Sequence, residues 1–175
     1  MEKIKVLFDD EVLQKRIEVL ANELYDIYKD EEVVFVSVLK GSVFFACDLA
    51  KKYKGDARIE FMRVSSYEGT DSTGQITLKL PLKEENIRNR HVLIVEDIVD
   101  TGYTLEFLRK YIGEMNPKSL RECTLLNKKS RRVVPIEPSF VGFEIEDLFV
   151  IGYGLDYDEK YRNLPYIGVV VNEEN

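Results

Sequence analysis

Hydrophobic and polar residues follow two different periods along this chain, one typical of helices and the other of buried strands. Between residues 10 and 28, apolar side chains recur every three or four positions and Asp10 is available as an N-cap, so the pattern predicts an amphipathic helix. Residues 33–39 are almost entirely apolar and mostly β-branched, which is typical of a strand buried on both faces of a parallel sheet. A turn at 40–42 follows, and Ser42 can cap a second helix.

The rest of the chain continues this alternation of strands and helices. Strands are predicted over 57–65, 75–82, 91–95, 120–126, 148–152 and 166–171, and helices over 42–53 and 103–114. The segment 67–74 is small and polar and predicts a loop, whereas 75–82 alternates as an antiparallel arm would. The pattern predicts one α/β domain over 1–175, with a mostly parallel twisted sheet flanked by helices on both faces. Ligands bind such sheets beyond the carboxyl ends of the strands.

Composition and charge narrow the classes of protein to consider. Hydrophobic residues make up 45% and charged residues 33%, which excludes disordered, collagen-like and membrane-spanning classes. The 32 acidic residues outnumber the 25 basic ones and give a formal charge of −7, so neither nucleic acid nor a membrane is expected as a partner. Cys47 and Cys123 lie far apart in apolar segments, and the chain starts without an apolar signal segment. Both features favour a cytoplasmic protein with reduced thiols.

The segment 91–104 carries the most informative chemistry. An apolar strand is predicted to end in the adjacent carboxylates Glu96 and Asp97, Asp100 follows, and Thr-Gly-Tyr-Thr at 101–104 opens a helix. Backbone NH groups and hydroxyls at such a helix start can bind a phosphate. The two carboxylates beside it can accept hydrogen bonds from vicinal sugar hydroxyls or hold a hydrated Mg²⁺. The alternative is that 100–101 only caps the helix and the acidic pair is a solvated strand end.

The run Val95 to Thr104 resembles the phosphoribosyl diphosphate (PRPP) binding motif of the phosphoribosyltransferases, in which two acidic residues precede two apolar residues, Asp, Thr or Ser, and Gly. The other segments resemble the hypoxanthine-guanine branch of that family and occur in the same order: Lys40-Gly41, Ser66-Tyr67, Lys128 with Arg132, 141–144, 149–150, 152–157 and 162–164. The resemblance implies the fold of that family, with a small hood formed by the terminal segments and a mobile lid loop.

The resemblance also implies roles for individual residues. Glu96 and Asp97 would hold the ribose hydroxyls, and Asp100 would take the proton near purine N7. The residues implied for the 5′-phosphate are Asp100, Thr101, Gly102, Tyr103 and Thr104. The residues implied for pyrophosphate are Lys40, Gly41 and Arg162, and those for Mg²⁺ are Glu96, Asp97 and Asp156. Read without the resemblance, Lys40-Gly41 is an ordinary turn and 156–159 a solvated run of charges.

A second group of residues is implied for the purine base and for the lid. Lys128 would donate to the 6-oxo group, Phe149 would stack on the ring, and the Val150 backbone would face the N1 and C2 side. Ser66 and Tyr67 would belong to a lid that keeps water from the reacting centre. Without the resemblance, Lys128 would be read as a surface lysine and 149–150 as part of a buried strand.

The implied activity is purine salvage. The enzyme would transfer phosphoribose from PRPP to N9 of hypoxanthine, and of guanine, with Mg²⁺ as cofactor and a homodimer or homotetramer as the assembly. Ser42 and Tyr103 depart from residues common in relatives, and both positions act through the backbone. One rival is an enzyme of the same fold that uses xanthine. The other is a nucleotide-responsive regulator that contacts RNA or DNA, for which the acidic balance is unfavourable.

Overall fold

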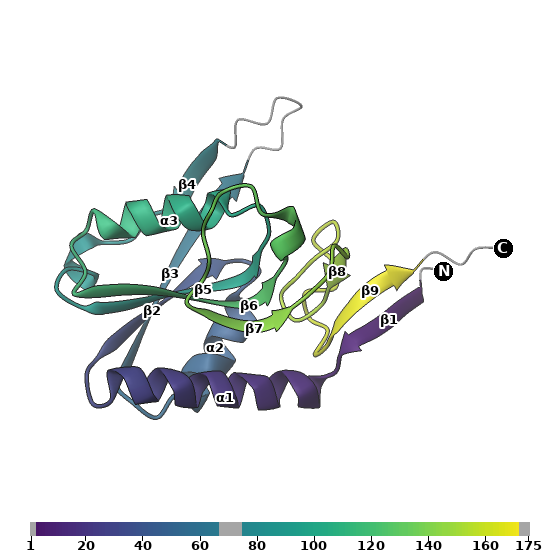
Figure 1. The fold of residues 1–175 in the computed structure, drawn as a ribbon, viewed down its shortest axis with the longest axis horizontal. Coiled ribbons are helices and arrows are strands. Elements are labelled where there is room, and N and C mark those ends of the chain that lie inside the picture. Colours follow the sequence, from purple (N-terminus) through teal and green to yellow (C-terminus); the bar gives the residue numbers. More distant parts are fainter. Residues whose placement is uncertain (1–2, 67–74, 172–175) are drawn as a thin grey trace.

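The computed structural model describes residues 3–66 and 75–171, which form a large sheet flanked by helices and a small sheet beside it (Figure 1). The helices are α1 (Asp10–Tyr28), α2 (Val43–Lys52) and α3 (Tyr103–Gly113), with 3₁₀ turns η1 (Glu84–Asn86) and η2 (Lys129–Arg131). The strands are β1 (Lys3–Phe8), β2 (Val33–Leu39), β3 (Ala57–Ser66), β4 (Ile76–Leu80), β5 (His91–Val99), β6 (Ser119–Asn127), β7 (Phe140–Glu144), β8 (Val150–Ile151) and β9 (Ile167–Val171).

The large sheet has the order β4-β3-β2-β5-β6-β7, and all neighbours are parallel except β3 and β4. This confirms the mostly parallel sheet and the antiparallel arm predicted from the alternation of residues. The small sheet, of order β1-β9-β8, joins the two ends of the chain and forms the expected hood. Strand β1 was not predicted, although Lys3-Ile4-Lys5-Val6 alternates polar and apolar residues; it pairs antiparallel with β9.

Helices cover both faces of the large sheet, as Figure 1 shows with α1 and α2 below it and α3 above it. Side chains of β2 alternate between the two layers. Val33 and Phe35 pack with α1 and α2, whereas Val34 and Val36 pack in the core that includes α3. Full burial of both faces accounts for the almost continuous apolar composition of β2.

Helix α1 has the predicted bounds and buries Ile17, Leu20 and Leu24 of the predicted stripe, but it has a different cap and a partly different buried face. The N-cap is Asp9, whose Oδ1 accepts a hydrogen bond from the amide of Val12 at 2.9 Å, and not Asp10. Val12 and Ile27 are exposed, whereas the buried side chains are Leu13, Ile17, Leu20, Ala21, Leu24 and Tyr28. The packed stripe is therefore turned by about one residue from the one that the apolar pattern predicts.

The largest correction concerns β5, which extends to Val99 instead of ending at Val95. Its pairing with β2 stops at Val95, but β6 continues alongside it, with Glu96 opposite Thr124 and Val99 opposite Asn127. The acidic pair therefore lies within the last part of a strand. Strand β7 was not predicted, and β8 is shorter than predicted. The predicted loop 67–74 lies outside the described residues, and no helix among the described residues could cross a membrane.

Candidate active site

A cavity of about 430 Å³ lies at the carboxyl ends of β2, β3 and β5, where ligands bind parallel sheets. All residues that the resemblance assigns to pyrophosphate, ribose and metal line it, together with one residue of the expected lid and one of the expected phosphate loop. These lining residues are Lys40, Gly41, Ser66, Glu96, Asp97, Thr104, Asp156 and Arg162. They come from five separate parts of the chain, so the fold brings together residues that the sequence analysis could connect only by resemblance.

Glu96 and Asp97 form the acidic wall of this cavity. Glu96 is 6% exposed, and its Oε1 is buried without a hydrogen-bond partner in the described structure. Burial raises the pKa of Glu96 well above its usual range, and the neighbouring Asp97 carboxylate raises it further. Burial also raises the pKa of Asp97, although the Ile98 amide donates to its Oδ1 at 2.7 Å. A buried and a half-buried carboxylate side by side favour a ligand that brings protons or positive charge.

The turn after β2 contacts both this pair and the loop that follows β8. The peptide bond between Leu39 and Lys40 is cis. A Cβ on Gly41 would overlap the Asp97 carboxylate, and a Cβ on Gly154 would overlap the Gly41 carbonyl oxygen. Glycine is therefore required at both positions by close approach, and Gly154 also has a φ of +98°.

The two cations expected to contact pyrophosphate lie on opposite sides of one carboxylate. Lys40 Nζ is 2.8 Å from Glu159 Oε2, and Arg162 Nη2 is 3.0 Å from Glu159 Oε1. Arg162 also donates to the Gly154 carbonyl at 2.7 Å and lies 3.4 Å from Asp156. Hydrogen bonds from Lys40 and Arg162 lower the pKa of Glu159 to about 2.

The expected phosphate loop, residues 100–104, follows β5 and includes the start of α3. Gly102 is the N-cap of α3 with a left-handed φ of +95°, and a Cβ there would contact the Ile136 side chain. Thr104, in the first turn of α3, lines the cavity, whereas Tyr103 points to a more exposed position. The Thr101 carbonyl accepts hydrogen bonds from the chain after η2, which fixes the loop from its other side.

Asp100 belongs to a chain of alternating charges that leads away from the cavity. Its Oδ1 is 3.0 Å from Nε of Arg131, and Nη1 of Arg131 is 3.5 Å from Oδ1 of Asp147. The same Asp147 oxygen lies 3.7 Å from Nζ of Lys128. The Lys128 amide donates to the Val99 carbonyl at 2.9 Å, so the lysine lies directly beside the end of β5. The carboxylate expected to take a proton is thus linked to the lysine expected to recognise the base.

Lys128 and Phe149 both differ from what their sequence alone suggests. Lys128 is buried and not a surface lysine, and Phe149 is 56% exposed and not a core residue. The Phe149 ring packs edge to face against Tyr157, with centroids 5.7 Å apart. Val150 begins β8 and is buried. An exposed aromatic ring held by a second ring is suited to stacking on a planar ligand.

The site fits a divalent cation through a few carboxylates rather than a complete protein ligand set. Within 3–66 and 75–171, no three His, Cys, Asp or Glu side chains converge on one point. The unpartnered Oε1 of Glu96 and the adjacent Asp97 nevertheless offer oxygen donors, and Asp156 lines the same cavity. Mg²⁺ commonly binds one or two carboxylates and completes its octahedron with substrate phosphates and water. The donors present fit that mode.

Some lining residues were missed from the sequence. Arg63 and Ser65 on β3 line the cavity, and their place at the carboxyl end of a predicted parallel strand was the available signal. Glu159, which contacts Lys40 and Arg162, was also missed, because in the sequence it is only part of the charged run 156–159. Ser66 lines the cavity as the last residue of β3, whereas the other expected lid residue, Tyr67, lies outside the described residues.

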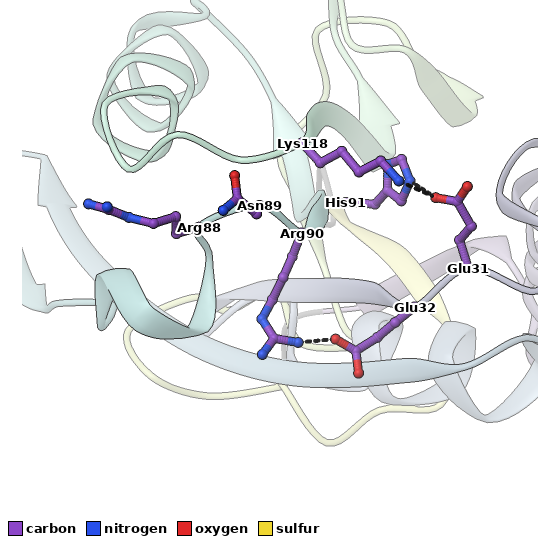
Figure 2. A pocket seen from close by; sticks show the side chains of 7 residues that line it. All are labelled: Glu31, Glu32, Arg88, Asn89, Arg90, His91 and Lys118. Carbon is purple, nitrogen blue, oxygen red and sulfur yellow. Dashed lines mark hydrogen bonds and ion pairs between the residues drawn. The ribbon is translucent and has the colours of Figure 1, made fainter.

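A second cavity, of about 480 Å³, lies at the opposite end of the strands, where β2, β5 and β6 begin. Figure 2 shows Lys118 pointing toward Glu31 and Arg90 toward Glu32. Glu31 also contacts Nε2 of His91. These charges neutralise one another, and together they connect the starts of neighbouring strands. We therefore assign this cavity a structural role.

The ion pairs of Glu32 in the second cavity predict that the stability of the protein depends on pH. Hydrogen bonds from Arg58 and charge from Arg58 and Arg90 lower the pKa of Glu32 below 4.5. A carboxyl with a lowered pKa in the folded state stabilises the protein above its unfolded pKa, and this contribution is lost as the pH falls through the folded value. Glu32→Gln should therefore lower the melting temperature at pH 7 and have little effect near pH 3.

Thermal melts of Glu32→Gln and of Glu85→Gln, at several pH values, measure this difference. Glu85 is an exposed glutamate of η1 and serves as the control. An equal loss of melting temperature for Glu32→Gln at both ends of the pH range would contradict the assigned ion pairs.

Comparisons with known proteins agree with this geometry. Residues 6–158 match the phosphoribosyl transferase domain family. The hypoxanthine phosphoribosyltransferase of Salmonella typhimurium is 44% identical over 170 residues, which cover 96% of each chain. The hypoxanthine-guanine-xanthine phosphoribosyltransferase of Tritrichomonas foetus is 44% identical over 169 residues, 95% of this chain and 91% of that protein. A crystal structure of a hypoxanthine-guanine phosphoribosyltransferase from Bacillus anthracis has a TM-score of 0.90 at 43% identity, with 97% of this chain and 100% of that one covered.

Proposed function

This chain belongs to the phosphoribosyl transferase family, and we propose that it transfers the 5-phosphoribosyl group of PRPP to N9 of hypoxanthine and of guanine. The products are the purine nucleotide and pyrophosphate, as purine salvage requires. One observation carries the proposal: the cavity at the strand ends gathers Glu96, Asp97, Lys40 and Arg162. Among the described residues, Oε1 of Glu96 and Nε of Arg162 are buried in this cavity without hydrogen-bond partners, which is typical of a site whose ligand supplies them.

The ribose and its phosphate are assigned to β5 and the start of α3. Glu96 and Asp97 accept hydrogen bonds from the 2′ and 3′ hydroxyls, which satisfies carboxylates that burial otherwise penalises. The 5′-phosphate is held by residues 100–104, where backbone amides open the helix. The left-handed Gly102 shapes this loop and keeps it close to the ligand.

The leaving pyrophosphate is assigned to Lys40, Gly41 and Arg162. Charge develops on pyrophosphate as the bond to C1′ breaks, so cations fixed beside it stabilise the transition state more than the ground state. Mg²⁺, held through Glu96, Asp97 and Asp156, would neutralise the diphosphate oxygens. Ser66 and Tyr67, of which Tyr67 lies outside the described residues, are assigned to the exclusion of water from C1′.

The purine base is assigned to the chain of alternating charges that links Asp100 to Lys128, and to the residues at the start of the small-sheet strand β8. Lys128 donates to the 6-oxo group, Phe149 stacks on the purine, and the Val150 backbone faces its N1 and C2 side. Asp100 accepts the proton released near N7 as N9 attacks C1′. Lys128 is buried beside Val99 and held near Asp147, so its amino group is positioned for a hydrogen bond that adenine cannot accept.

A panel of bases tests the proposed function. With PRPP and Mg²⁺, hypoxanthine and guanine should give nucleotide and pyrophosphate, whereas adenine should give neither; chromatography of the products measures both. Omission of Mg²⁺ is the control and should abolish transfer. Turnover of xanthine at a comparable rate would favour the first rival, a possibility that the Tritrichomonas relative makes worth testing. Failure of all bases with folded protein would favour the regulatory rival.

We also propose a homodimer or homotetramer in the cytoplasm. Ile59 and Phe61 lie on one face of β3 and are 41% and 39% exposed, and Leu80 on β4 continues this apolar area at 43%. A second copy of the chain would remove this surface from water. The free thiols of Cys47 and Cys123 suit a reducing compartment.

If a second copy of the chain covers this apolar area, a charged substitution within it should lower the mass of the protein in solution. Phe61→Glu should shift the protein to a monomer, because a charge would be buried at the centre of the contact. Light scattering after size-exclusion chromatography measures the mass, and Val133→Glu, another exposed apolar position, is the control. A monomeric unmodified protein would contradict the proposal.

A further inference from the structure

One carboxylate of the site, that of Glu159, has no part in the reaction described above. It lies between the two cations assigned to pyrophosphate, with one oxygen 2.8 Å from Lys40 Nζ and the other 3.0 Å from Arg162 Nη2. A planar carboxylate that shares its two oxygens between two cations offers them the acceptors that a phosphoryl group would offer. Glu159 and pyrophosphate therefore compete for the same donors.

The backbone around Glu159 holds its side chain in this position. The Glu159 amide donates to Asp156 Oδ2 at 2.9 Å, and Tyr157 and Lys160 exchange two backbone hydrogen bonds. Arg162 is fixed separately, because its Nη1 donates to the Gly154 carbonyl. Displacement of the carboxylate thus requires rotation of one side chain only, and Arg162 keeps its place when that occurs.

We propose that Glu159 is a positioning residue that occupies the pyrophosphate subsite of the free protein, holds Lys40 beside the separately fixed Arg162, and is displaced by pyrophosphate. This inference rests on the proposed function, because that function assigns the two cations to pyrophosphate. It goes further by giving Glu159 control over how tightly the leaving group is held and how readily it departs.

The strength of the contacts suits displacement. The Lys40 and Glu159 side chains are 44% and 61% exposed, and exposed ion pairs are weak. Pyrophosphate carries more charge and more acceptor oxygens than a single carboxylate, so it wins the competition when it is present. The carboxylate regains the cations after the product leaves, which favours release over retention.

The test is the affinity for pyrophosphate with Mg²⁺ in the absence of base, measured by calorimetry on the full chain. Glu159→Gln removes the competing charge and keeps the shape, so the dissociation constant should fall by about two- to tenfold, as expected for the loss of two ion pairs made by an exposed carboxylate. Asp158→Asn makes the same change of charge at the neighbouring residue and should change the constant less than about twofold by screened long-range attraction alone.

Kinetics give a second readout. Pyrophosphate should become a stronger product inhibitor of Glu159→Gln by the same factor, and the KM for PRPP should fall more than kcat changes. Equal dissociation constants for Glu159→Gln and Asp158→Asn, or weaker binding by Glu159→Gln, would overturn the inference. Failure of the unmodified protein to bind pyrophosphate would instead overturn the assignment of the subsite in the proposed function.

Discussion

Asp100→Asn is expected to lower kcat by about 10²-fold, the lower part of the range for loss of a general base. Asparagine has the same shape but cannot accept the proton that leaves the purine as N9 attacks C1′. The KM for PRPP should change little, because the carboxylates assigned to ribose, Glu96 and Asp97, remain. Steady-state rates with hypoxanthine, measured by the change in absorbance on nucleotide formation, give both constants.

The matched control for this prediction is Asp147→Asn. Asp147 contacts the same guanidinium as Asp100, that of Arg131, and it also lies near Lys128. Its replacement disturbs the charge chain without removing the proposed proton acceptor. A loss of kcat for Asp147→Asn equal to that for Asp100→Asn would indicate that Asp100 acts through the charge chain and not as a base.

The layers of this fold could be predicted because most of the central strands and all three α-helices carry a local signal, whereas β1 and β7 were missed. The apolar run 33–39 indicates a doubly buried strand, and α1 has the predicted bounds, even though its cap is Asp9 and its buried stripe is turned. The length of β5 could not be read locally. It extends past Val95 because β6 continues to supply backbone partners. The acidic residues in this part of the strand give no local signal of a strand, since the pairing depends on a segment far away in sequence.

The candidate site divides in the same way. The segment 96–104 could be recognised because its chemistry is contiguous in sequence. The contacts of Gly41 with Asp97 and Gly154, and the contact of Glu159 with Lys40, join segments that are far apart along the chain. Such contacts arise from the crossing of loops at one end of the sheet, and no periodicity encodes them. The roles assigned to the individual residues stay predictions until the proposed variants are measured.

The contact between two glycines gives the second large expected effect. Gly154→Ala should lower kcat/KM for PRPP by roughly 10²-fold, since displacement of a positioning loop by about 1 Å can have that effect. The added methyl group would overlap the Gly41 carbonyl oxygen, which is backbone and cannot rotate away. Alanine would also be strained at a φ of +98°. The turn that carries Lys40 must then separate from the loop that carries Arg162, and the pyrophosphate cations lose their common geometry.

Gly113→Ala is the control, because a Cβ at the end of α3 meets nothing within 4 Å. This variant should keep its activity, and its melting temperature should be unchanged or higher, since alanine favours helix over glycine by about 0.5–1 kcal/mol. Circular dichroism separates loss of the fold from loss of the site. A folded Gly154→Ala protein with unchanged kcat/KM would show that the two loops move independently, and the pyrophosphate subsite would then have to be assigned without the contact between them.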